Sequence, residues 1–123
     1  MSRIHPTAQV DAGARIPEGV EIGPGCVIAD DVEIGAGTVL REYVVIREHT
    51  TLGEGNFVDA HCVLGGWPQD RKFDASQKSR LQIGDDNIFR EGVTISRATG
   101  DGEVTRVGNG NFWMTGTHAG HNA

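Results

Sequence analysis

The chain has 123 residues, which suits one ordinary domain, and its formal net charge of −6 argues against nonspecific binding to nucleic acid. Hydrophobic residues make up 37% and aromatic residues 6%, so a core built from large side chains is not expected. No apolar run approaches the ~18 residues of a membrane span, and the first ten residues lack the apolar segment of a secretion signal. We expect a cytoplasmic protein that neither enters a membrane nor binds nucleic acid.

A six-residue period runs through the first half of the chain. Eleven consecutive positions spaced six apart are all Ile, Val or Leu. Neither an α-helix nor an alternating strand has this period, whereas a hexapeptide repeat is typical of a parallel β-helix. In that all-β fold, three hexads close one triangular coil and the branched anchor residues stack inside. The anchors are Ile4, Val10, Ile16, Ile22, Ile28, Ile34, Leu40, Ile46, Leu52, Val58 and Leu64.

The two cysteines occupy equivalent places in this repeat. Cys26 and Cys62 both stand four residues after an anchor, and they are separated by two whole coils. Because stacked strands lie about 4.8 Å apart, their Cα atoms should be about 9–10 Å apart. A disulfide requires less than about 7 Å. We therefore predict two reduced, unpaired thiols buried in the helix.

Two segments interrupt the period, and it resumes after each. The first is the polar stretch 65–80, after which anchors continue at Ile83; the second is 98–105, after which they continue at Val107. We expect both to be loops extruded from a coil, since long loops on a compact scaffold tend to carry function. Disordered insertions are the alternative. The whole count gives about six coils in a single domain, 1–123.

The hexad count predicts where these loops meet. Loop 65–80 leaves the eleventh hexad, loop 98–105 leaves the fourteenth, and His121 lies in the seventeenth. Because every third hexad shares a face, all three should lie along one edge of the scaffold, where we expect a ligand site. His118 ends the sixteenth hexad and should lie near the adjoining corner. The alternative is that both histidines are ordinary surface residues without a functional role.

The first loop has side chains suited to a polyhydroxylated or phosphorylated ligand. A solvated charge cluster is the plain alternative, but the aromatic residues Trp67 and Phe73 favour a contact surface. Trp113 holds an anchor position, so either that coil is wider or the indole lies at a subunit contact. The polar candidates are Gln69, Asp70, Arg71 and Lys72.

Three segments resemble, in order and spacing, the UDP-N-acetylglucosamine O-acyltransferases that open lipid A synthesis. They are "GGWPQDRKF", "IGDDNIFREGVTI" followed by "SRAT", and "VGNGNFWMTGTHAGHN", and the resemblance runs from "IHPTAQV" to "HAGHNA". It implies a homotrimer of left-handed β-helices with active sites between subunits. It also implies transfer of a 3-hydroxyacyl group from acyl carrier protein to a UDP-amino sugar. We expect no cofactor.

The resemblance assigns roles to individual residues. The general base falls on His121 and its companion on His118, while the contacts to the sugar nucleotide fall on Asp70 and Lys72, with Gln69 beside them. Histidine, with a reference pKa near 6.5, suits proton removal from a sugar hydroxyl at neutral pH. A zinc site would need three or four ligands, so no metal is expected.

Three features depart from the family pattern. Asn122 follows His121 where the family often has an acidic residue, and Ser96 stands where histidine is usual. The family's further coils and C-terminal helical domain, which carry the oxyanion amide and the carrier-protein surface, would lie beyond Ala123. We therefore expect weak or no transfer by this chain alone. One alternative is a non-catalytic trimeric β-helix that binds a sugar nucleotide or has a structural role. Another is zinc chemistry like that of γ-class carbonic anhydrases, but the spacing of "HAGH" does not resemble the histidine spacing of that family.

Overall fold

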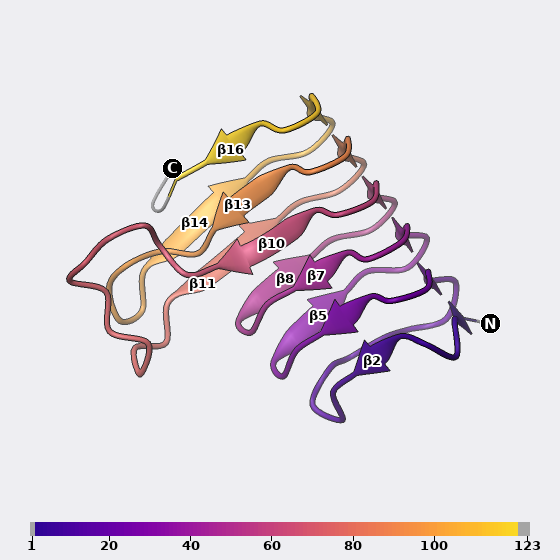
Figure 1. Cartoon of the computed structure of the whole chain (residues 1–123), viewed down its shortest axis with the longest axis horizontal. Helices are drawn as coiled ribbons and strands as arrows, with labels where there is room; N and C mark the ends of the chain where they lie inside the picture. The colour runs from indigo at the N-terminus through magenta and orange to yellow at the C-terminus, as the bar shows by residue number, and fades with distance from the viewer. Residues whose placement is uncertain (1, 121–123) are drawn as a thin grey trace.

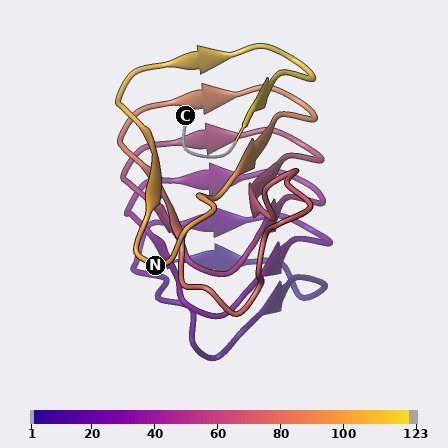
Figure 2. The ribbon, with the colours of Figure 1, turned by 90° about the vertical axis from the view of Figure 1, so that its left-hand side faces the viewer.

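The computed structural model describes residues 2–120, which wind into a stack of triangular coils (Figures 1 and 2). Short strands form the sides of each coil, because each hexad supplies an extended segment and then a turn. The strands are β1 Arg3–Ile4, β2 Gln9–Val10, β3 Glu21–Ile22, β4 Val27–Ile28, β5 Val32–Ile34, β6 Val39–Leu40, β7 Val45–Ile46, β8 Thr50–Leu52, β9 Phe57–Val58, β10 Val63–Gly66, β11 Arg80–Ile83, β12 Ile88–Phe89, β13 Thr94–Ser96, β14 Val104–Val107, β15 Phe112–Trp113 and β16 His118–Ala119.

Three parallel sheets form the faces of the prism. Sheet A contains β1, β3, β6, β9, β12 and β15; sheet B contains β2, β4, β7, β10, β13 and β16; sheet C contains β5, β8, β11 and β14. Anchors pair with anchors one coil away, as Ile22 does with Leu40 and Leu40 with Val58. The predicted β-helix is therefore confirmed, with the six-residue register kept on both sides of the two loops. Within residues 2–120 there is no helix long and apolar enough to cross a membrane.

The anchor residues fill the interior of the prism. From Ile22 through Ile95 they are almost completely buried, whereas Ile4 in the first coil is 44% exposed. Cys26 and Cys62 are buried and unpaired, as predicted, and their thiols donate hydrogen bonds to the carbonyl oxygens of Arg41 (2.9 Å) and Arg90 (3.0 Å). Burial raises the pKa of both thiols, to about 11 for Cys62.

Buried polar side chains join successive coils where sheet C turns into sheet A. Asn56 Nδ2 donates to the carbonyl oxygen of Gly84, and Asn56 Oδ1 accepts the backbone N–H of Asn87. Asn87 repeats the pattern one coil further, toward the carbonyl of Gly108 and the N–H of Asn111. A buried amide whose donors and acceptors are used in this way satisfies turn groups that the strand ladder leaves unpaired.

Both loops leave the helix where sheet B turns into sheet C, and Figure 1 shows them projecting from the same end of these strands. Loop 67–79 joins β10 to β11, and loop 97–103 joins β13 to β14. Some residues at the ends of the predicted loops 65–80 and 98–105 therefore belong to strands. The β10 strand exits through a bulge at Gly65, because Leu64 and Gly66 pair with the adjacent residues Ile95 and Ser96. Gly65 has φ 87°, which favours glycine there.

Candidate functional site

The strands that carry the predicted site residues are neighbours in sheet B. Leu64 of β10 pairs with Ile95 of β13, and Ile95 pairs with Ala119 of β16. The predicted relation between the eleventh, fourteenth and seventeenth hexads is thereby confirmed for the anchors. The proposed base, His121, lies outside the described residues.

His118 lies on the outer surface of sheet B, and its expected place near the adjoining corner is wrong. In each strand that contains an anchor, the residue before the anchor belongs to the same strand, so His118 pairs with Thr94. Its side chain is exposed. Its Nδ1 is 2.8 Å from Thr94 Oγ1 and 3.2 Å from the Thr94 carbonyl oxygen. Because a carbonyl only accepts, this contact favours a proton on Nδ1 and leaves the Nε2 lone pair available to a ligand.

The first loop presents its polar candidates to solvent. Gln69, Asp70 and Lys72 are exposed, and Asp70 organises the turn that carries them. Its Oδ1 accepts the backbone N–H of Lys72 at 2.9 Å, and its carbonyl oxygen accepts the N–H of Phe73 at 3.0 Å. Asp70 and Lys72 are therefore held two residues apart on one ordered segment, where a carboxylate and an ammonium group can meet one polar ligand.

The structure brings the loop roots and the His118 strand together, but not their polar side chains. Among the described residues no hydrogen bond or ion pair joins His118 to Gln69, Asp70 or Lys72. A ligand that uses both would have to extend along the outer surface of sheet B toward the loop. This requirement fits an elongated molecule better than a compact one.

Two other positions singled out in the sequence are wholly or partly buried. Ser96 is only 5% exposed and pairs with Gly66, so it is not displayed to a ligand as an exposed residue would be. Trp113 is half-buried, packs on the core and stacks with Phe89 at a ring separation of 5.9 Å. Within residues 2–120 its Nε1 has no hydrogen-bond partner. The indole is thus accommodated inside its own coil.

A charged side chain that the sequence pattern does not indicate lies under the first loop. Arg97 is 0% exposed, and its guanidinium lies beside Ser79, Glu48 and Phe73. The only signal in the sequence was an arginine two residues after the anchor Ile95, at the start of the second loop. That position alone did not distinguish a buried arginine from a solvated one.

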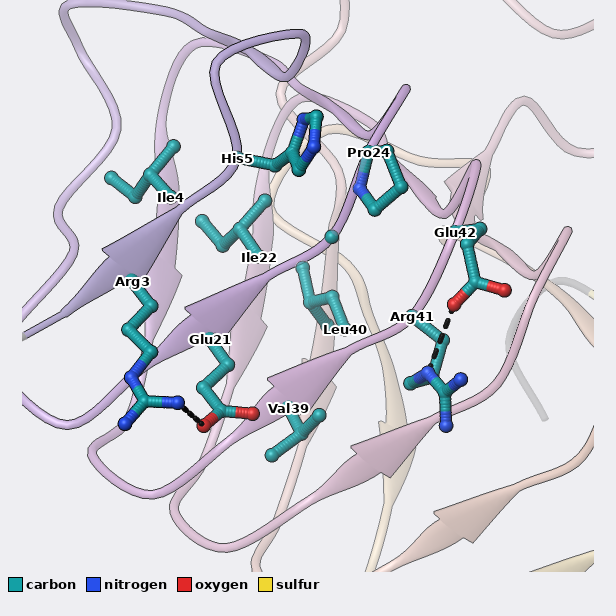
Figure 3. Close-up of a pocket in the computed structure, with 11 residues that line it drawn as sticks. Arg3, Ile4, His5, Glu21, Ile22, Pro24, Val39, Leu40, Arg41 and Glu42 are labelled. Carbon is teal, nitrogen blue, oxygen red and sulfur yellow. Dashed lines mark hydrogen bonds and ion pairs between the residues drawn. The ribbon is translucent and has the colours of Figure 1, made fainter.

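A separate open groove of about 360 Å³ lies on sheet A, in the first coils (Figure 3). It contains none of the loop residues. Its rim has two ion pairs, Arg3 with Glu21 at 3.6 Å and Arg41 with Glu42 at 2.9 Å, and its floor is formed by aliphatic anchors. In the part of the chain that the structure covers, no cluster of three or more His, Cys, Asp or Glu residues could hold a metal ion.

The repeat and the three parallel sheets define a left-handed parallel β-helix of the hexapeptide-repeat class. A family model described as "Bacterial transferase hexapeptide (six repeats)" matches residues 13–48. Over part of their length, the chain is similar to proteins named as UDP-N-acetylglucosamine O-acyltransferases.

Two curated relatives carry the name acyl-[acyl-carrier-protein]–UDP-N-acetylglucosamine O-acyltransferase. The protein of Stenotrophomonas maltophilia is 52% identical over 97% of this chain and 45% of its own length. That of Alkalilimnicola ehrlichii is 61% identical over 98% of this chain and 47% of its own. The chain thus spans about half the length of the curated relatives it matches. The predicted resemblance is confirmed over that part.

Solved structures agree with this assignment. The UDP-N-acetylglucosamine O-acyltransferase of Moraxella catarrhalis superimposes with a TM-score of 0.90 at 42% identity, covering 96% of this chain and 46% of that one. The UDP-N-acetylglucosamine acyltransferase of Francisella novicida gives a TM-score of 0.90 at 38% identity, covering 96% and 43%. The coils of this chain are therefore closely similar to the corresponding part of these two solved structures.

Proposed function

We propose that the chain binds a UDP-amino sugar along the loop-bearing edge of sheet B and takes part in transfer of a 3-hydroxyacyl group to that sugar from acyl carrier protein. The observation that carries the proposal is the adjacency of β10, β13 and β16, which unites both loop roots with the histidine-bearing strand. The names of the relatives supply the substrate and the donor.

The reaction requires a base and a group that orients the acceptor. The sugar hydroxyl attacks the thioester carbonyl; a C–O bond forms, the C–S bond breaks, and the hydroxyl proton passes through the base to the departing thiolate. We assign the base to His121 and orientation of the sugar to His118. A positioned histidine base typically contributes about 10²–10⁴ in rate.

The first loop supplies the complementary charges. The Asp70 carboxylate can accept hydrogen bonds from sugar hydroxyls, Lys72 can pair with the diphosphate, and Gln69 can both donate and accept. All three side chains are exposed on one turn. An elongated sugar nucleotide, with a hydroxylated end and an anionic end, suits a surface in which loop and histidine are set apart.

The outer faces of the sheets support assembly into a trimer. Outward residues of sheet A form an apolar ladder in which Phe57 pairs with Ile88 and Ile88 with Phe112, and the last two are 39% and 60% exposed. Sheet B has a shorter ladder, with Val27 beside Val45. Outward residues of sheet C, such as Gln82 and Arg106, are polar. Two apolar faces and one polar face suit a closed ring in which each copy contacts two others. Sedimentation that gave a folded monomer would contradict the ring.

Calorimetry with UDP-N-acetylglucosamine tests the binding part of the proposal. Asp70→Asn and Lys72→Met should each weaken binding about tenfold, the loss expected for a charged hydrogen-bond partner. Lys78→Met, a charge change elsewhere in the same loop, is the matched control and should bind like the parent chain. Undiminished binding in the Asp70 and Lys72 variants would refute the loop assignment.

The catalytic part is tested in a chimera that joins this chain to the remaining half of a relative. His121→Ala should abolish acyl transfer from acyl carrier protein, while His118→Ala should chiefly weaken sugar-nucleotide binding. If His121→Ala kept full kcat and His118→Ala lost it, the assignment of the base would be wrong. No transfer by the chimera, with binding intact, would favour a non-catalytic binding protein.

A further inference from the structure

A completely buried guanidinium lies beneath the exposed loop that carries Gln69, Asp70 and Lys72. Arg97 ranks among the largest fully buried side chains of the described residues, although arginine is rarely buried unless paired. Removing its charge from water is unfavourable and must be offset by local partners. Those partners come from the two preceding coils, and neither terminal nitrogen of the guanidinium has a hydrogen-bond partner within residues 2–120.

Arg97 holds the first loop at its start, middle and end. Its backbone N–H donates to the carbonyl oxygen of Gly66 at 2.9 Å, just before the loop begins. Its Cζ lies 5.2 Å from the centre of the Phe73 ring, in cation–π geometry. Its Nε donates to Oγ of Ser79 at 3.2 Å, where the loop ends. One side chain and its own peptide group therefore fix the path of loop 67–79.

Glu48, on the preceding coil, extends the same arrangement. Its Oε2 is 3.1 Å from Arg97 Nη1 and also accepts the indole N–H of Trp67 at 3.2 Å. Burial raises the pKa of Glu48, but its own backbone N–H, Trp67, Arg47 and Arg97 more than offset this, so the pKa is lowered overall and the group is charged at neutral pH. A single carboxylate thus connects the loop's first residue to the buried guanidinium.

The two aromatic residues bracket the ligand-facing turn. The rings of Trp67 and Phe73 lie 6.0 Å apart, and Gln69, Asp70 and Lys72 all lie between them in sequence. Each aromatic residue contacts one member of the Arg97–Glu48 pair. A displacement of that pair would therefore move both ends of the turn.

The second loop braces the first from the other side. The backbone N–H of Lys78 donates to Asp101 Oδ1 at 2.8 Å, and the N–H of Ala98 donates to the carbonyl oxygen of Arg80 at 3.3 Å. Because loop 97–103 begins at Arg97, the two loops share the same root. They form one unit fixed at the buried guanidinium.

We infer that Arg97 and Glu48 are positioning residues that hold the loop 67–79 in its ligand-binding shape, with Trp67 and Phe73 as the contacts through which they act. The identity of the ligand, a UDP-amino sugar, rests on the function proposed above; the effect on the loop does not. Lysine cannot replace Arg97, because an ammonium lacks the planar group that places Nε on Ser79 and Nη1 in an ion pair with Glu48 while Cζ lies over the Phe73 ring.

The test separates loop position from ligand binding. The chain has two tryptophans, so Trp113→Phe leaves Trp67 as the only one. In that background, acrylamide quenching of Trp67 reports the loop, and calorimetry with UDP-N-acetylglucosamine reports the site. Arg97→Lys and Glu48→Gln should raise the quenching constant about twofold and weaken the sugar nucleotide about tenfold. Arg106→Lys, an exposed arginine hydrogen-bonded to Gln82, should change neither.

Each outcome bears on the inference. Quenching and affinity in Arg97→Lys equal to those of Arg106→Lys would overturn it, and so would altered affinity with unaltered quenching. If neither the unmodified chain nor the Trp113→Phe parent bound the sugar nucleotide, the proposed function would fail, while the quenching series would still decide whether Arg97 holds the loop. If Arg97→Lys did not fold, Phe73→Leu would serve in its place, because it removes the aromatic ring that contacts Arg97 and leaves Arg97 itself unchanged. Unchanged Trp67 quenching in that variant would overturn the inference.

Discussion

The side chains of Asp31 and Arg80 meet at 2.7 Å, although 49 positions separate them in the sequence. The same carboxylate oxygen accepts a hydrogen bond from Nδ1 of His49, 2.8 Å away and one coil along. Arg80 opens β11 directly after the first loop, so this pair joins the loop's exit to a coil formed early in the chain. The contact lies at the same corner as the Arg97–Glu48 pair and completes the support beneath the loops.

Asp31 makes the stability of the fold at this corner dependent on pH in the acidic range. The hydrogen bond from His49, and after it Arg80, lowers the pKa of Asp31 to about 2 from 3.8, although burial acts in the opposite direction. A lowered pKa stabilises the fold above the unfolded value, and the contribution disappears as pH falls from about 3.8 toward 2. Asp31→Asn should therefore cost about 1 kcal/mol at pH 6, after allowance for solvent screening, and little near pH 2.

Urea unfolding at pH 6, 4 and 2.5 measures this difference. Asp30→Asn, a change to the exposed neighbouring carboxylate, is the control and should not reproduce the pH dependence. A constant difference between Asp31→Asn and the parent chain across the three pH values would contradict the assignment.

The buried thiols should resist modification while the chain is folded. Both cysteines are 0% exposed, and burial raises the pKa of Cys62 to about 11, so little thiolate exists at pH 8. Reaction with a disulfide reagent at pH 8 should be at least about 100-fold slower in the native protein than in denaturant. Two thiols per chain should react after unfolding without reductant, and none would refute the predicted register.

The volume at Cys62 gives a second measurement of the same register. Cys62→Leu should lower the free energy of unfolding by about 1–3 kcal/mol, because the coil interior has no room for the added carbons. Cys62→Val is the matched control, since Val44 fills the equivalent place one coil earlier and is also buried. It should stay within about 1.5 kcal/mol of the parent chain. Equal losses in both variants would indicate that volume is not the cause.

The buried side chains of Asn56 and Asn87 should stabilise the fold through their hydrogen bonds. Asn87→Ala leaves the carbonyl oxygen of Gly108 and the N–H of Asn111 without their partner, and should lower the free energy of unfolding by about 1–3 kcal/mol. Asn111→Ala removes an exposed side chain of the same type one coil further and should cost less than about 0.5 kcal/mol. Chemical denaturation of the two variants measures both values; similar losses would contradict the role of the buried amide.

Sequence periodicity predicted the fold because every sixth side chain meets the same environment. Ile22, Leu40 and Val58 lie in one stack, so residue type alone reveals the register and the shared face of the two loop roots. The contacts of the loops have no such repetition. Arg97 meets Glu48 and Phe73 through a chain path that occurs once, and nothing in its local sequence distinguishes it from an exposed arginine.

The prediction of where His118 lies was wrong for a different reason. A hexad count gives the spacing of anchors but not where each strand begins, and β16 begins one residue before its anchor. Because the strand begins one residue earlier than the hexad count implied, His118 lies on the outer surface of sheet B and not at a corner. The same rule explains why Thr94, to which the sequence motifs assigned no role, is the residue that contacts the imidazole.

Thr94 should therefore affect ligand binding without contacting the loop. Its hydroxyl lies 2.8 Å from Nδ1 of His118 and, with its carbonyl oxygen at 3.2 Å, holds the Nδ1 side of the imidazole against Thr94. Thr94→Val keeps the β-branched shape but removes the hydroxyl, and should weaken binding of UDP-N-acetylglucosamine by about 1 kcal/mol, or about fivefold. Thr94→Ser keeps the hydroxyl and should retain the parent affinity. Calorimetry gives the affinities, and imidazole ¹⁵N shifts report whether the proton stays on Nδ1. If Thr94→Val bound as tightly as Thr94→Ser while His118→Ala did not, His118 would bind the ligand without depending on Thr94 for its orientation.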